Sequence, residues 1–169
     1  SLTSLAQRAA FERLRKACPE LPLEMEVGLR KLAPAQKYLP KISNVENGEL
    51  YAVWPFRVVS LARPTLLVEA KRAYAHRRNR LDAGWGYEGN VAELLGLTEE
   101  AARILRVKVA NSHPAYRWPG TWGPNFDWLP DQNHGGNLLN TTQLMLIQAE
   151  PIEQGGAIRL FPAWPISWD

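Results

Sequence analysis

A short polar segment, Trp128-Leu129-Pro130-Asp131-Gln132-Asn133-His134-Gly135-Gly136, holds side chains that could do chemistry together. The Asp131 carboxylate can take a proton from water, and the neighbouring amides of Gln132 and Asn133 can hold that water, which is what a general base requires. The two glycines let backbone approach a ligand and leave open donors at a helix start. We therefore predict Asp131 as a catalytic base, with Gln132, Asn133 and His134 lining the site.

Each of these residues has a second interpretation. Asp131 could simply satisfy N–H groups at a loop or helix entry, as Asp often does. His134 could bind a metal, but the chain has three His and no second ligand at metal spacing, so we expect no metal and no cofactor. Glu46 and Glu49 are explained as partners of a helix dipole, or as ligands of sugar hydroxyls. Serine-nucleophile and phosphate-loop motifs are absent from the sequence.

Tryptophan is unusually common, with seven residues in the chain. Trp85, Trp122 and Trp128 stand among Gly and Pro in segments without helical periodicity. Aromatic faces on loops can pack against the apolar faces of sugar rings, so these three are candidate substrate-binding residues. The alternative is that they fill gaps between helices.

The composition bounds the class of protein. The 169 residues, 46% hydrophobic and 22% charged, fit one globular unit spanning 1–169. The net charge of +3 is mild, and we interpret the basic run 71–80 as a solvated helix face, so no nucleic acid is expected. No apolar run is long enough to span a membrane, and no signal peptide is visible. Cys18, the single cysteine, excludes an internal disulfide and is expected in the core.

Apolar residues at helical spacing predict a mainly α fold. Pro and Gly separate the periodic stretches, and the segments 21–43 and 111–136 are expected to be irregular. Thr65 and Thr98 are predicted N-caps, and Gly96 is predicted in the left-handed region after a helix. The buried face of the helix after Thr98 would carry Ala102, Leu105 and Val109. Helices are predicted at 2–17, 49–54, 65–79, 91–95, from 98 onward and at 137–149, with one strand at 157–161.

Read in chain order from about Asn44 to Pro165, these segments resemble the C-terminal part of the catalytic domain of glycoside hydrolase family 95, the α-L-fucosidase and α-L-galactosidase group of six-hairpin toroid enzymes. The Pro130–Gly136 segment resembles the family loop that carries the catalytic base. The other matching motifs are Leu50-Tyr51-Ala52-Val53-Trp54-Pro55, Gly84-Trp85-Gly86, Leu146-Ile147-Gln148 and Gly156-Ala157-Ile158-Arg159-Leu160-Phe161-Pro162-Ala163-Trp164-Pro165.

This resemblance implies part of an (α/α)6 toroid with a short C-terminal β-strand or hairpin, and Asp131 as the base of an inverting hydrolysis. The general acid would lie upstream of this chain, so the partners would be a glycan substrate and the remaining N-terminal part of the domain. The parent enzyme would be secreted or periplasmic. Asn44, Glu46 and Glu49 replace a His-rich run of the family, and Gln132 and His134 replace a Gly and an aromatic, so fucose is not assumed.

Inverting hydrolysis needs two carboxyl groups roughly 6.5–9.5 Å apart, and the sequence offers no convincing second one. Two rival hypotheses therefore stand beside the enzyme. One is a non-catalytic carbohydrate-binding module that uses the Trp-rich loop. The other is a helical interaction module whose aromatic loop packs against another chain.

Overall fold

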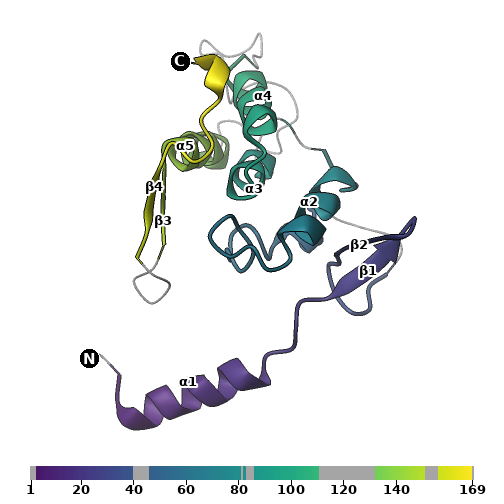
Figure 1. Ribbon diagram of the computed structural model, residues 1–169, viewed down its shortest axis with the longest axis vertical. Helices are drawn as coiled ribbons and strands as arrows, with labels where there is room; N and C mark the ends of the chain where they lie inside the picture. The colour runs from purple at the N-terminus through teal and green to yellow at the C-terminus, as the bar shows by residue number, and fades with distance from the viewer. Residues whose placement is uncertain are drawn as a thin grey trace.

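The computed structural model describes residues 3–39, 46–80, 82, 86–110, 132–150 and 156–168, and these residues are mainly helical (Figure 1). The described helices are α1 (Leu5–Ala17), α2 (Leu67–Ala75), α3 (Glu88–Leu94), α4 (Thr98–Ala110) and α5 (Gln132–Leu146). Two antiparallel hairpins join β1 (Leu23–Glu26) to β2 (Leu29–Leu32) and β3 (Ile147–Ala149) to β4 (Ile158–Leu160). Short 3-10 turns, η1 (Gly48–Leu50) and η3 (Ile166–Trp168), complete the description.

Helix α1 confirms the predicted N-terminal helix. Ser4 caps it: its hydroxyl accepts the Gln7 N–H, and the Gln7 side chain accepts the Ser4 N–H. Figure 1 shows α1 standing apart from the other elements, and none of its residues is buried. Phe11 and Leu14 are 59% and 64% exposed. Within the described residues, α1 therefore holds its shape through local interactions alone.

The segment expected to be irregular after α1 contains the β1–β2 hairpin, so that prediction was wrong. Val27 and Gly28 form its two-residue turn, both with positive φ (50° and 76°), which is the geometry that matches the twist of paired strands. The sequence signal was hidden because Val is rarely used at such a position. β2 packs against α2, where Arg30 Nε donates to Glu69 Oε1 at 2.9 Å.

Two predicted helices are shorter than expected. The stretch predicted as a helix over 49–54 is a 3-10 turn at Gly48–Leu50 followed by turns as far as Phe56, because Pro55 removes a backbone donor. Helix α2 ends at Ala75 instead of Asn79. Thr65 does not cap it; Leu66 precedes the helix with a positive φ of 73° and no capping side chain.

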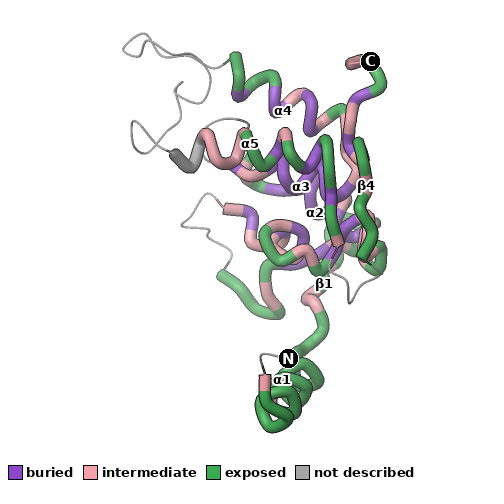
Figure 2. Tube along the Cα trace, turned by 90° about the vertical axis from the view of Figure 1, so that its left-hand side faces the viewer, coloured by how far each residue is buried: buried purple, intermediate pink, exposed green. Residues whose placement is uncertain are grey.

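The main hydrophobic core forms where η1, α2 and α3 meet, and Figure 2 shows burial concentrated around these helices. Every residue of α3 is buried. Gly96 follows α3 with φ 70°, which confirms the predicted left-handed position. The core residues from these three elements and the segments joining them are Leu50, Val53, Val59, Ala70, Ala73, Tyr74, Val91, Ala92, Leu94 and Leu95.

Helix α4 matches its predicted buried face at two of three positions, and α5 differs from prediction in extent. On α4, Ala102 and Leu105 are buried as predicted, whereas Val109 is 52% exposed and the last buried position is Lys108, which is 1% exposed. Helix α5 begins at Gln132, five residues before the predicted start, and its backbone changes to strand at Ile147. Residues 132–136, expected in a loop, are therefore helical.

The C-terminal segment closes against α4 and α5. The predicted strand is confirmed as β4, paired with β3. Trp164 and Trp168 pack edge to face, with ring centroids 5.4 Å apart, against a small cluster of Ala102, Leu105 and Met145. These two tryptophans therefore fill a gap between elements. Cys18 is exposed rather than buried, because it lies at the end of the isolated α1.

No helix within the described ranges is both long and apolar enough to cross a membrane.

Candidate functional site

The start of α5 is the natural place to look for a site, because the predicted base directly precedes it in sequence. Asp131 lies outside the described residues, as do Trp85, Trp122 and Trp128. Gln132, Asn133 and His134 form the first turn of α5, although their side chains are not described. A helix start presents unpaired backbone N–H groups and the positive end of the dipole, both of which favour a carboxylate there.

The first turn of α5 has open space beside it. Gly135 and Gly136 are partly exposed, and a Cβ added to either would meet no atom within 4 Å. A ligand or another segment can therefore approach this turn closely.

Helix α5 is held in place by α3. Gly89 approaches Thr141 so closely that an added Cβ would lie 2.7 Å from Thr141 Oγ1. Thr141 Oγ1 donates to Asn90 Oδ1 at 2.8 Å, and Asn90 Nδ2 donates to Asn137 Oδ1 at 3.4 Å. These contacts fix the middle of α5 against the first turn of α3.

The two helices run in the same direction. Asn90 contacts Asn137, near the start of α5, whereas the Glu93 carbonyl, three residues later, accepts a hydrogen bond from Gln148, which follows α5. The two helices are therefore parallel, and the first turn of α3 lies beside the middle of α5. Helix α4 connects them, and Figure 2 shows α5 beginning on the side where α4 ends.

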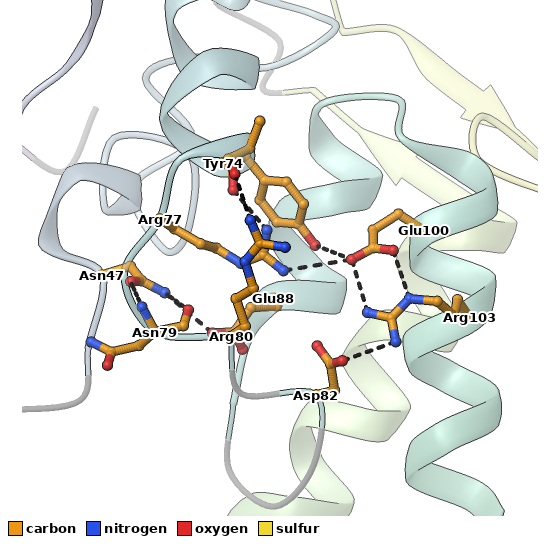
Figure 3. A network of polar contacts seen from close by, with 10 residues as sticks. Asn47, Tyr74, Arg77, Asn79, Arg80, Asp82, Glu88, Glu100 and Arg103 are labelled. Atoms are coloured by element: carbon orange, nitrogen blue, oxygen red, sulfur yellow. Dashed lines mark hydrogen bonds and ion pairs between the residues drawn. The ribbon is translucent and has the colours of Figure 1, made fainter. Parts of the chain in front are cut away.

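A buried amide organises the start of α3. Asn47, which is 2% exposed, donates from Nδ2 to the Asn79 carbonyl at 2.8 Å and to Glu88 Oε1 at 3.3 Å, and its Oδ1 accepts the Asn79 N–H at 3.1 Å (Figure 3). The Tyr87 hydroxyl accepts the Asn47 N–H at 3.3 Å. Asn47 thus ties the segments before η1, after α2 and before α3 into one rigid junction.

Arginines extend this junction toward α4 (Figure 3). The Arg103 guanidinium lies between two carboxylates: one of its terminal nitrogens is 2.9 Å from Asp82 Oδ2, and its Nε is 2.7 Å from Glu100 Oε2. These hydrogen bonds raise the pKa of the guanidinium. The side-chain hydrogen bond from Arg103 is the main reason that the pKa of Glu100 is lowered. Arg77 stacks 3.8 Å above the Tyr74 ring and lies 3.5 Å from Glu100. The basic run 71–80 was predicted to be wholly solvated, but Arg77 is buried within it.

Lys108 is a buried cation close to the start of α3. Its ammonium donates to the Gly86 carbonyl, next to the start of α3. Burial lowers the pKa of Lys108 to about 8, although Glu88 and Asp82 oppose that change. The protonated ammonium places a positive charge beside the start of α3.

The two described acidic candidates, Glu46 and Glu49, do not share one pocket. The Glu46 carboxylate accepts a hydrogen bond from the Tyr51 hydroxyl, and this bond is the main cause of the raised pKa of Tyr51. Glu49 is partly buried, and desolvation raises the pKa of its carboxyl. Glu49 lines a polar cavity of about 200 Å³ beside the β1–β2 hairpin, whereas Glu46 does not.

Glu93 is a buried carboxyl group that sequence reasoning missed. It is fully buried, neither of its oxygens has a hydrogen-bond partner among the described residues, and burial raises its pKa to about 10. However, it lies level with Gln148, at the far end of α5. A 15-residue helix is about 22 Å long, so Glu93 is too far from the start of α5 to act opposite a base there.

Other residues that position the site were also missed, notably Asn47, Asn79, Asn90 and Lys108. Polar residues in short apolar stretches could have indicated buried amides, since buried polar groups need partners. Among the described residues, no group of three or more His, Cys, Asp or Glu side chains could hold a metal ion.

Comparisons of this chain with protein-family models, with curated proteins and with solved structures found no match.

Proposed function

We propose that this chain is the C-terminal part of the catalytic domain of an inverting exo-glycoside hydrolase, similar to glycoside hydrolase family 95, with Asp131 as the general base. The observation that carries the proposal is the start of α5. Asp131 directly precedes that helix, and the open space at Gly135 and Gly136 leaves its first turn accessible. Asn47 and Lys108 hold the start of the parallel neighbouring helix α3.

The helix order supports placement in an α/α toroid. A ring of helical hairpins alternates an inner helix with an outer helix of opposite direction, so that successive inner helices are parallel. Helices α3 and α5 are parallel neighbours, and α4 joins them. In our proposal α3 and α5 are inner helices and α4 is outer.

The chemistry would follow from two carboxyl groups on opposite faces of one sugar. Asp131 would remove a proton from water as it attacks the anomeric carbon, and a second carboxyl, roughly 6.5–9.5 Å away, would protonate the leaving oxygen. That acid would come from the upstream part of the domain. The residues proposed to line the sugar site are Gln132, Asn133, His134, Trp85, Trp122 and Trp128. Glu46 and Glu49, which were predicted with them, do not share one pocket and are proposed to contact other parts of the glycan. No cofactor is needed.

Several apolar side chains are exposed, as we expect if part of the helical ring lies outside this chain. On α1, Leu5 is 83% exposed and Phe11 59%. On the β3–β4 hairpin, Ile158 and Leu160 are 65% and 67% exposed. Exposed apolar side chains such as these are available for an interface. The proposal assigns it to contacts with the N-terminal part of the same catalytic domain.

The test uses the full-length polypeptide that carries this chain, with aryl glycosides of L-fucose, L-galactose and D-galactose as substrates. Asp131→Asn keeps the side-chain shape but removes the base, so kcat should fall about 10²–10⁴-fold. NMR of the first product should show inverted anomeric configuration. The control is Glu99→Gln, an exposed carboxylate in the first turn of α4. Activity of Asp131→Asn within about tenfold of the wild type would refute the assignment of the base.

One observation favours a second candidate, a helical interaction module. The amphipathic α1 buries none of its residues against the rest of the described chain, as a helix awaiting a partner would. A third candidate function is a non-catalytic carbohydrate-binding module. Full-length protein that binds glycans without hydrolysing any of them would favour the binding module, and protein that does neither would favour the interaction module.

A further inference from the structure

A small polar cavity of about 200 Å³ lies between the β1–β2 hairpin, η1 and the segment after α2. Its volume equals the liquid volume of about seven water molecules, which suits one sugar ring better than an extended chain. Carboxylates and basic groups face each other around it. The charged residues that line it are Glu24, Glu26, Lys31, Glu49, His76 and Arg78.

Most of these groups form a fixed frame. Lys31 Nζ lies 3.0 Å from Glu24 Oε1 and 2.9 Å from Glu26 Oε2, and the Lys31 side chain is only 11% exposed. His76 Nδ1 lies 3.6 Å from Glu26 Oε2. The Tyr38 hydroxyl donates to Glu24. These pairs hold the wall of the cavity in one geometry, which reduces the entropy lost when a ligand binds.

Glu49 is the exception in this frame. No ion pair or hydrogen bond joins its carboxylate to another side chain within the described parts of the chain, although Lys31 and Arg78 are near enough to influence its charge. Burial is the main cause of the raised pKa of Glu49, and a hydrogen bond from its own backbone N–H only partly opposes that rise, so part of the hydration lost by the carboxylate is not replaced. A hydrogen-bond donor from a ligand would replace it.

The cavity adjoins the junction at the start of α3. Glu49 lies two residues after Asn47, and Arg78 directly precedes Asn79, which Asn47 binds through two hydrogen bonds. Asn47 also binds Glu88, the first residue of α3. The cavity is therefore a neighbour of the start of α3.

We propose that this cavity binds one neutral sugar unit, through hydroxyl groups that donate to Glu49 and accept from the basic side chains opposite. The three carboxylates and the three basic residues nearly balance in charge. A charged ligand would pair with only one of these two sets and would be repelled by the other. A sugar hydroxyl both donates and accepts, as this mixed lining requires. The choice of a saccharide rests on the proposed function, in which the cavity is a subsite for a part of the glycan next to the sugar that is cleaved.

The experiment measures binding of D-galactose, L-fucose and D-glucose to the full-length protein by saturation-transfer NMR and calorimetry, with D-glucuronate and D-glucosamine as charged counterparts. Neutral sugars should bind, and Glu49→Ala should weaken that binding about tenfold or more, the effect of one hydrogen bond to a charged group. Glu49→Gln, which keeps the side-chain shape, serves as a milder second variant, and circular dichroism checks that both fold. Glu99→Ala on α4 should bind like the wild type.

The proposal is overturned if folded Glu49 variants bind neutral sugars as tightly as the wild type does, or if only a charged sugar binds. The same experiment in the Asp131→Asn background separates this inference from the proposed function. Glu49-dependent binding in a protein without hydrolase activity would support the subsite and contradict the enzyme. Hydrolysis that depends on Asp131, with a KM that Glu49→Ala leaves unchanged, would support the enzyme and contradict the subsite.

Discussion

Helices α1 and α3 are stabilised in opposite ways. Helix α1 has 13 residues, a capping box and no buried residue. Helix α3 has seven residues, no capping side chain and no exposed residue. Isolated helices shorter than about 12–15 residues are marginal in water, so α3 is stable only because the surrounding structure covers it. The helix with the stronger local signal is therefore the one that contributes less to the packed core.

The largest expected effect comes from replacing a leucine beside α3 with alanine, compared with the same replacement on α1. Leu95→Ala, directly after α3, removes a fully buried side chain and should cost about 2–5 kcal/mol of unfolding free energy. Leu14→Ala on α1, where the side chain is 64% exposed, should change it by less than about 0.5 kcal/mol. Urea unfolding followed by tryptophan fluorescence measures both. Equal losses would mean that α1 is packed against the core in solution.

The second expected effect depends on pH. Burial raises the pKa of Glu93 to about 10 from 4.5, so the folded state retains a proton that the unfolded state releases above pH 4.5. The resulting penalty is absent below pH 4.5, grows as pH rises and levels off near pH 10. At pH 7 it amounts to about 3 kcal/mol by linkage. Glu93→Gln should therefore stabilise the protein at pH 7–9 and have little effect at pH 4, as thermal unfolding would show.

Glu12→Gln on α1 is the matched control for this pH profile. Its carboxylate is exposed and pairs with Arg15, and the hydrogen bond from Arg15 lowers the pKa of Glu12. Its small contribution should therefore be lost as pH falls, the opposite direction from Glu93. A Glu93→Gln variant whose advantage is the same at pH 4 and pH 8 would contradict the buried, protonated carboxyl.

The smallest expected effect concerns the contact between α3 and α5. In Gly89→Ala the new methyl group would lie 2.7 Å from Thr141 Oγ1, whose hydrogen bonds to Asn90 and Asn137 resist movement. We expect a loss of about 1–3 kcal/mol from overpacking, partly offset by the better helix propensity of Ala. Gly135→Ala meets no atom within 4 Å and should gain up to about 1 kcal/mol. Thr141→Ala should rescue Gly89→Ala in a double-mutant cycle if the contact is the cause.

The sequence predicted those parts of the fold whose signals are local. Helix α1 and strand β4 were recognised from apolar periodicity and turn residues. The first turn of α3 was missed because Gly89 and Asn90 are poor helix formers. They are helical because Asn47 binds Glu88, and Thr141 packs on Gly89 and binds Asn90, all contacts between residues far apart in sequence.

The predicted site at 131–136 remains a prediction, because Asp131 lies outside the described residues. The sequence did not predict the helix that begins at Gln132. Lys108 was not among the residues predicted to be buried on α4, since a charged side chain is rarely buried. Its burial depends on the Gly86 carbonyl, 22 positions earlier in the chain, so no pattern within α4 could reveal it.

The exposed Cys18 follows the last residue of α1 and is the single cysteine of the chain. One maleimide reaction would therefore attach a spin label or fluorophore at one defined position, the hinge between α1 and everything after it. Such a probe would report whether α1 changes its orientation when a partner, a glycan or the rest of a larger polypeptide is present.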